Sequence, residues 1–245
     1  MNSEMETDSA RPFWRRLIAE FVGTGLLVAI VVGSGIMASR LSPGDVGVQL
    51  LENSLATALG LAVLILVLGP VSGAHFNPVV SIVDAVASHG AGLSAGETAG
   101  YVLAQIGGAV SGALLANAMF GIPVAIATTD RVSWGTLVGE VVATAGLLLV
   151  ILGLSRTGRP AVIAAAVGAY IGAAYWFTSS TSFANPAVTI GRIFSDTFAG
   201  IAPTSALAFI AAQLVGGAIG LALAIALFPR LPQTAADLVV PTTDR

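Results

Sequence analysis

An Asn-Pro pair that occurs twice, as Asn77-Pro78 and as Asn185-Pro186, constrains the fold more than any other feature of the sequence. Each pair stands at the head of a short apolar run, from Asn77 to about 87 and from Asn185 to about 194. Asn is a preferred N-cap and Pro is well tolerated at the first helical position, so each pair predicts a helix start. About ten residues of helix span about 15 Å, which is about half of the roughly 30 Å hydrocarbon core of a bilayer. The two runs are therefore predicted to be half-length helices that meet at the middle of a membrane.

The composition supports a membrane setting. Of the 245 residues, 56% are hydrophobic and 9% are charged, whereas soluble domains carry about 25% charged residues. Apolar stretches long enough to cross a bilayer are predicted at 14–39, 49–68, 97–118, 134–154, 161–177 and 203–228. Gly69-Pro70 is predicted to end the second of them. The fold class is thus an all-α membrane protein with six transmembrane helices and two half-membrane re-entrant helices.

The two halves of this single domain repeat each other. The two Asn-Pro pairs lie 108 positions apart, and Gln105 and Gln213 recur at the same offset. Glu20 and Glu140 also match, in the first span of each half. Each half, about 13–118 and about 134–228, contains three spans, an odd number, so the second half enters the membrane from the opposite side. This is an inverted repeat, which places the functional site at the midplane between the halves.

The ends of the chain and its charges fix further expectations. Residues 1–12 are predicted to be a disordered tail and 229–245 a polar tail, flanking the domain at 13–228. The chain has no Cys, and a net charge of -3 without a basic stripe gives no sign of nucleic-acid binding. All ten basic residues are Arg, and excess basic charge marks the cytoplasmic side. The chain is therefore expected to be a multi-pass protein of the cell (inner) membrane, with both termini in the cytoplasm. This orientation places seven arginines inside (Arg11, Arg15, Arg16, Arg156, Arg159, Arg230, Arg245) and three outside (Arg40, Arg131, Arg192).

Six spans, duplicated halves and the two Asn-Pro motifs resemble the aquaporin and glycerol-facilitator family over about residues 13–228. The resemblance implies a passive channel for water and small neutral solutes, surrounded by lipid and assembled as a homotetramer, with no enzyme activity, cofactor or metal. Asn amides and the positive ends of the half-helices would donate to neutral solutes and repel cations. The implied pore motifs are Asn77, Pro78 and Val79 in the first half, and Asn185, Pro186 and Ala187 in the second.

The resemblance also implies a selectivity filter, in which this chain departs from the family. Val188 stands where most members have an Arg, which removes a donor and a positive charge. Counting back from the second motif as in the family places Ser182 and Ala173 in the filter, and the fourth position falls on Thr57 or, with a two-residue shift, on Leu59. Small residues at all four positions would make a wider constriction than that of a strict water channel. The missing Arg resembles a bacterial subset of the family that lacks the filter arginine, and this resemblance implies glycerol-like polyols and neutral metalloid acids such as arsenous acid as substrates.

Other polar residues have two candidate roles each. Arg192 lies one helical turn after Val188 and either forms a positive ring at the pore mouth or pairs with Asp196 at i+4. His75 is expected to line the cytoplasmic vestibule as part of the pore wall, and a proton switch is its alternative role. By resemblance, Glu20, Glu140, Gln105 and Gln213 are structural buried polar residues that hold the loops before the half-helices.

Two other functions compete with the channel. An inverted-repeat secondary transporter would need a buried ion-coupling site, and the span-embedded carboxylates would be its candidates. An intramembrane protease would use Ser72 as nucleophile, but the only histidines are the nearby His75 and His89, and neither comes from another span. The transporter therefore remains the serious alternative.

Overall fold

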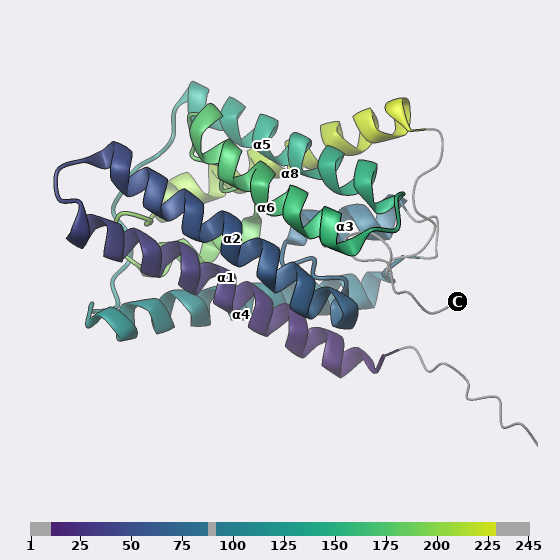
Figure 1. The fold of residues 1–245 in the computed structure, drawn as a ribbon, viewed down its shortest axis with the longest axis horizontal. Helices are drawn as coiled ribbons and strands as arrows, with labels where there is room; N and C mark the ends of the chain where they lie inside the picture. Colours follow the sequence, from purple (N-terminus) through teal and green to yellow (C-terminus); the bar gives the residue numbers. More distant parts are fainter. Residues whose placement is uncertain (1–10, 88–91, 229–245) are drawn as a thin grey trace, which may run out of the picture.

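A computed structural model of the protein describes residues 11–87 and 92–228. Its long helices run side by side along one direction, and the first and last described segments lie at the same end of the bundle (Figure 1). The predictions for the tails at 1–10 and 229–245 lie outside the described residues, and so does His89.

Six helices in this part of the chain are long and apolar enough to cross a membrane. They are α1 (Phe13–Leu41), α2 (Val46–Ser72), α4 (Ala95–Phe120), α5 (Trp134–Ser155), α6 (Pro160–Phe177) and α8 (Pro203–Leu227). The two Asn-Pro motifs begin the short helices α3 (Pro78–Ala87) and α7 (Pro186–Gly191), and a 3-10 turn, η1 (Arg192–Phe194), follows α7. The predicted fold class is confirmed.

The short helices begin where the capping residues predict. The Asn77 side-chain oxygen accepts a hydrogen bond from the Val79 backbone N–H at 3.0 Å. The Asn185 oxygen accepts from the Ala187 and Val188 N–H groups at 2.9 and 3.3 Å. Since Pro lacks an N–H, its place at the first helical position costs no hydrogen bond.

The prediction that Gly69-Pro70 ends the second span is wrong. Helix α2 continues through Pro70 to Ser72, and it ends at Gly73, whose φ of +87° is left-handed. The Gly73 N–H donates to the Gly69 carbonyl at 2.8 Å. Pro70 lies in the last turn with an exposed ring, so the helix loses only one of its final backbone bonds there.

Close helix contacts at glycine hold each repeat together. Helix α1 packs against α4, and α5 packs against α8 in the second repeat. A Cβ at Gly108 would lie 2.2 Å from the Phe21 carbonyl oxygen, and one at Gly216 would lie 2.6 Å from the Val141 carbonyl oxygen. Only glycine allows the backbones to approach this closely, which is typical of helix pairs in membranes.

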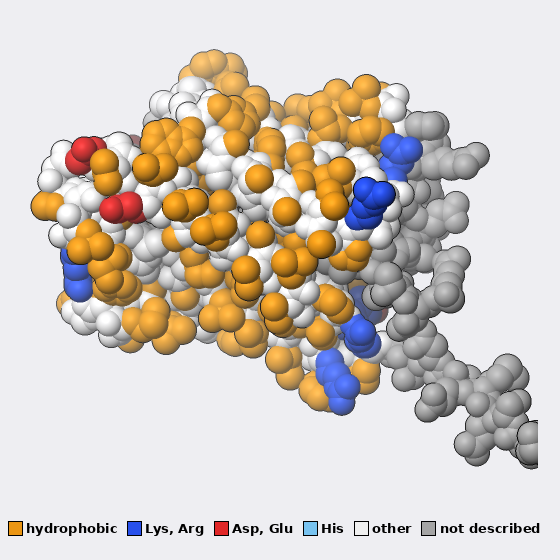
Figure 2. Space-filling view, in the orientation of Figure 1, with side chains coloured by type: hydrophobic (Ala, Val, Ile, Leu, Met, Phe, Trp, Pro, Cys, Tyr) orange, Lys and Arg blue, Asp and Glu red, His pale blue; other side chains and the backbone are white. Residues whose placement is uncertain are grey.

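The surface agrees with a lipid environment. Hydrophobic side chains cover the middle of the face in Figure 2, and the charged side chains visible there lie toward its two ends. Large exposed apolar residues occur on all six long helices, for example Leu26, Val63, Leu103, Val142, Val162 and Leu223. An apolar belt between polar ends is the pattern expected of a membrane-spanning bundle.

Candidate functional site

A narrow cavity of about 50 Å³ lies between the repeats. At about 10–15 Å³ for each water, this volume holds a short file of roughly four molecules. Helices α1, α2, α5 and α6 supply mostly aliphatic walls, and the loops before α3 and α7 supply most of the polar groups. The polar side chains that line the cavity are Thr57, His75, Asn77, Tyr175, Ser182, Asn185 and Arg192.

The two loops share one unusual backbone conformation. Phe76 and Ala184, each directly before an Asn-Pro pair, have φ values of +49° and +48°. Ala74 and Ser182, two residues earlier, both have a φ of +52°. Such left-handed conformations cost a non-glycine residue on the order of 1–3 kcal/mol, so the surroundings must hold them in place.

Glu20 on α1 holds the first loop. Its carboxylate accepts hydrogen bonds from the backbone N–H groups of His75 at 3.0 Å and Phe76 at 2.7 Å. The Ser72 hydroxyl and the Gln105 amide also donate to it, at 2.6 and 2.7 Å. The carboxylate is fully buried, and all its bonds go to the loop and its supports.

Glu140 on α5 holds the second loop in the same way. It accepts from the Phe183 and Ala184 N–H groups, both at 2.9 Å, and from the Gln213 amide at 2.6 Å. The hydrogen bonds are those that the family resemblance implies for the four buried polar residues. They explain how the strained loop backbones persist.

The two Asn side chains tie the loops to each other. The Asn77 amide donates to the Ala184 carbonyl at 2.8 Å, and the Asn185 amide donates to the Phe76 carbonyl at 2.7 Å. An amide group carries two N–H bonds, so each Asn keeps one for the cavity that it lines.

The other residues of the two motifs lie behind the cavity wall. Pro78, Val79, Pro186 and Ala187 are buried, and none of them lines the cavity. Val79 packs against α8, where a Cβ on Gly217 would lie 2.6 Å from its Cγ1. A glycine on the facing helix therefore makes room for the Val79 side chain.

Three of the predicted filter residues line the cavity. Thr57, Ser182 and Val188 all line it, and each is at most 5% exposed. The Ser182 hydroxyl has no protein partner in the described part of the chain. Of the two candidates on α2, Thr57 faces the cavity, whereas Leu59 is 61% exposed on the outer face of the helix.

The prediction for Ala173 is wrong. Helix α6 lines the cavity with Val167, Ile171 and Tyr175, which share one face at four-residue spacing. Ala173 lies about 200° around the helix from Ile171 and from Tyr175, and it is exposed. Tyr175 lines the cavity instead, with its hydroxyl 3.2 Å from the Thr57 hydroxyl. The constriction is therefore not made of small residues alone.

Arg192 lies against the cavity and does not pair with Asp196. The side chain is 3% exposed, its Nε donates to the Ala199 carbonyl, and its guanidinium stacks 3.4 Å from the Phe183 ring centroid. The Asp196 carboxylate instead accepts from the Thr128 N–H at 2.9 Å. The i+4 ion pair is thus absent, and Arg192 lines the cavity; its role at the pore mouth stays a prediction.

His75 lines the cavity on the side of α3. Its Nδ1 lies 3.1 Å from the Ser81 hydroxyl, and its ring meets the Tyr101 ring edge-on at 5.3 Å between centroids. The other ring nitrogen, Nε2, has no partner among the described residues. This nitrogen is itself buried, although the residue lines the cavity.

In the described ranges, no group of three or more His, Cys, Asp or Glu side chains has the arrangement of a metal site.

Comparison with known proteins agrees with this geometry. A family model described as Major intrinsic protein matches residues 7–182. The chain is 48% identical over 210 residues to aquaglyceroporin AqpS of Rhizobium meliloti (strain 1021), which covers 85% of this chain and 88% of the relative. It is 32% identical over 242 residues to the lens fiber major intrinsic protein of Gallus gallus, covering 93% and 87% of the two chains. The X-ray structure of the aquaglyceroporin from Plasmodium falciparum has the same fold, with a TM-score of 0.63, 24% identity and coverage of 89% and 96%.

Proposed function

The chain belongs to the major intrinsic protein family, and from this premise we propose that it is a passive channel for water and small uncharged solutes such as glycerol. Family members are channels and not enzymes, which removes the intramembrane protease from consideration. The observation that carries the proposal is the cavity between the repeats, where Asn77 and Asn185 each present a free amide N–H. Neutral solutes with oxygen atoms can accept these hydrogen bonds as they pass in file.

We assign the selectivity filter to Thr57, Tyr175, Ser182 and Val188. Three of these side chains have hydroxyl groups, and Val188 adds an aliphatic wall where most of the family has an Arg. A wall with polar and apolar sides suits a polyol, whose hydroxyl groups and carbon backbone face opposite directions. Neutral metalloid acids such as arsenous acid combine small size with several hydroxyl groups, and we include them among the proposed solutes.

The assembly and orientation are also proposed. Lipid is expected around the apolar belt, and a homotetramer is expected from the family. Both termini are assigned to the cytoplasm, because the described arginines Arg11, Arg15, Arg16, Arg156 and Arg159 belong to that side, against Arg40, Arg131 and Arg192 on the other. Protease protection of a C-terminal tag in inside-out and right-side-out vesicles tests this orientation.

An ion-coupled transporter is less well supported by the contacts of its candidate carboxylates. Glu20 and Glu140 already accept hydrogen bonds from backbone and amide donors of the two loops. A carboxylate engaged in this way has a structural role and is not presented to a coupling ion in the cavity.

Stopped-flow light scattering on proteoliposomes separates the two mechanisms. A channel gives glycerol flux that rises linearly with the gradient and does not change when proton or sodium gradients are collapsed. Saturation at millimolar glycerol, together with dependence on an ion gradient, would support the transporter.

A further inference from the structure

The outer end of the cavity holds a buried positive charge although the filter arginine is missing. Val188 occupies the filter position, and Arg192 lies one turn farther along the helical segment. Both side chains line the cavity. The Arg192 Nε–H donates a hydrogen bond to the Ala199 carbonyl. The other guanidinium nitrogens have no hydrogen-bond acceptor among the described residues, so their donors are free for solutes.

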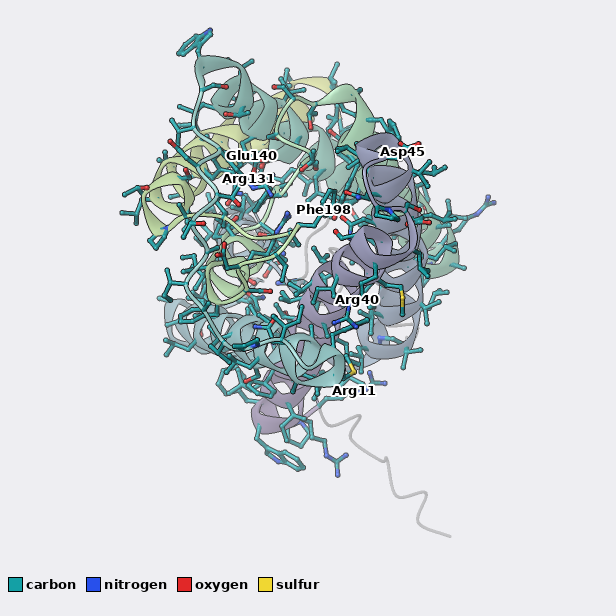
Figure 3. All side chains as sticks on the ribbon, turned by 90° about the vertical axis from the view of Figure 1, so that its left-hand side faces the viewer. Arg11, Arg40, Asp45, Arg131, Glu140 and Phe198 are labelled. Carbon is teal, nitrogen blue, oxygen red and sulfur yellow. The ribbon has the colours of Figure 1, made fainter. Side chains whose placement is uncertain are left out.

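A second arginine fixes the segment that holds Arg192. Arg131, in the connection between α4 and α5, donates from Nε to the Gly200 carbonyl at 2.7 Å. Its terminal nitrogen donates to the Phe198 carbonyl at 2.9 Å. These two carbonyls flank the Ala199 carbonyl, which accepts the hydrogen bond from Arg192. Arg131 therefore fixes the backbone segment to which Arg192 is bound. Figure 3 views the molecule from this end and labels Arg131 and Phe198.

Both arginines also share the Phe183 ring. The guanidinium of Arg192 lies 3.4 Å from the ring centroid, and that of Arg131 lies 5.6 Å from it. The ring itself is fixed, because Glu140 accepts from the Phe183 N–H and Phe209 packs edge-on against it at 5.2 Å between centroids. A guanidinium stacked on an aromatic face is well oriented, with its N–H groups directed sideways.

No ion pair neutralises Arg192 within the described residues. The groups within electrostatic range of it are Arg131, Glu140 and Tyr175. Glu140 brings one negative charge, which its hydrogen bonds to the second loop do not remove, and Arg131 brings a second positive charge, so the three charged groups sum to one positive charge. The net field at this end of the cavity is therefore repulsive to cations.

We propose that Arg192 is the charged selectivity residue of this channel, displaced one helical turn outward from the usual position. Arg131 is its positioning residue, acting through the 198–200 backbone and the Phe183 ring. The inference rests on the proposed channel function and adds to it that cations and protons are excluded despite Val188. Neutral polyols pass because they accept hydrogen bonds from the guanidinium and carry no charge.

The test measures cation leak and glycerol flux in the same proteoliposomes. In Arg192→Gln, the ratio of sodium or proton leak to glycerol flux should rise about tenfold or more. The matched control is Arg40→Gln, which removes an equal charge at the same end of the molecule from an exposed side chain that donates to the Phe120 carbonyl. The control should leave leak and flux unchanged. An unchanged leak ratio in Arg192→Gln overturns the proposal, whereas absence of any water or glycerol flux in the wild type overturns the channel function itself.

A rescue variant separates a charge effect from general damage to the pore. Adding Val188→Arg to Arg192→Gln returns an arginine to the usual position, and the cation leak per channel should fall back toward the wild-type value. The leak itself is compared here, because Val188→Arg also lowers the glycerol flux. If the double variant leaks as much as Arg192→Gln, the leak does not come from the missing charge and the proposal fails.

The positioning role has its own readout. Arg131→Lys keeps the charge, but one ammonium cannot reproduce the fork of Arg to two carbonyls. We expect a raised leak ratio in Arg131→Lys and a larger one in Arg131→Gln. We also expect the double variant Arg131→Gln with Arg192→Gln to leak no more than Arg192→Gln alone. If the leak of the double variant equals the sum of the two single-variant leaks, Arg131 acts by its own charge, which contradicts the positioning role. Detectable glycerol flux shows that each variant is folded.

Discussion

Replacing Gly108 with Ala should weaken the packing of α1 on α4 and reduce solute flux with it. The new Cβ would lie 2.2 Å from the Phe21 carbonyl oxygen and 3.0 Å from its carbonyl carbon. Ordinary contacts between such atoms are about 3.5 Å, so the two helices must move apart by roughly 1 Å. Glu20 precedes Phe21 on α1, so this movement would also pull its carboxylate away from the first loop.

The magnitude follows from two opposing effects. Gly→Ala inside a helix favours folding by about 1 kcal/mol through helix propensity. Overpacking a tight contact costs about 1–3 kcal/mol, and here the obstacle is backbone, which cannot change rotamer. Gly107→Ala is the matched control, because its Cβ would meet only the Phe21 ring at an ordinary 3.5 Å. We therefore expect a net loss of up to about 2 kcal/mol for Gly108→Ala and no loss for Gly107→Ala.

Thermal unfolding of the purified proteins in detergent, with glycerol flux in proteoliposomes, measures both effects. Gly108→Ala should unfold several degrees below the wild type and conduct less glycerol, while Gly107→Ala should match or exceed the wild type in stability. If Gly108→Ala is as stable as Gly107→Ala and conducts normally, the close-contact reasoning is refuted.

Two further predictions concern the loop and the constriction. Glu140→Ala leaves the buried Phe183 N–H and the Gln213 amide without their acceptor, at about 1–3 kcal/mol for each, so its unfolding temperature should fall more than that of Glu140→Gln, which keeps one acceptor oxygen. Equal unfolding temperatures of the two variants in detergent would show that acceptance of these hydrogen bonds is not what stabilises the loop. Tyr175→Ala should raise glycerol flux in stopped-flow experiments, because it removes a large ring from the cavity wall, whereas Ala173→Val on the exposed face of α6 should not change the flux. A larger effect from Ala173→Val would return the constriction to the position that the sequence predicts.

Features that depend on local chemistry could be predicted from the sequence. Asn77-Pro78 and Asn185-Pro186 each combine a cap with a residue suited to the first helical turn, so they located the short helices. The repeat offset and the odd number of spans predicted the arrangement of the halves. Pro70 was misjudged because a proline in the last turn of a helix is less disruptive than one in its middle.

Side-chain directions across loops could not be predicted in the same way. Counting back from Asn185 to Ala173 crosses the irregular segment 178–185, which does not preserve the register of α6. Arg192 and Asp196 were candidates for an ion pair because they are four residues apart. The helical segment formed by α7 and then η1 ends at Phe194, however, so the i+4 spacing of a helix does not reach Asp196. No sequence pattern marks Arg131, because its contacts depend on how two distant connections fold against each other.

The most direct test of the central claim is the ratio of glycerol to water permeability in proteoliposomes, compared between the wild type and Val188→Arg. The account predicts rapid glycerol flux in the wild type. It also predicts a loss of about tenfold in Val188→Arg, with water flux reduced less, because the longer charged side chain narrows the constriction between Thr57 and Tyr175. Fast water flux with glycerol excluded in the wild type would contradict the proposed filter, and so would a Val188→Arg variant that conducts glycerol as well as the wild type.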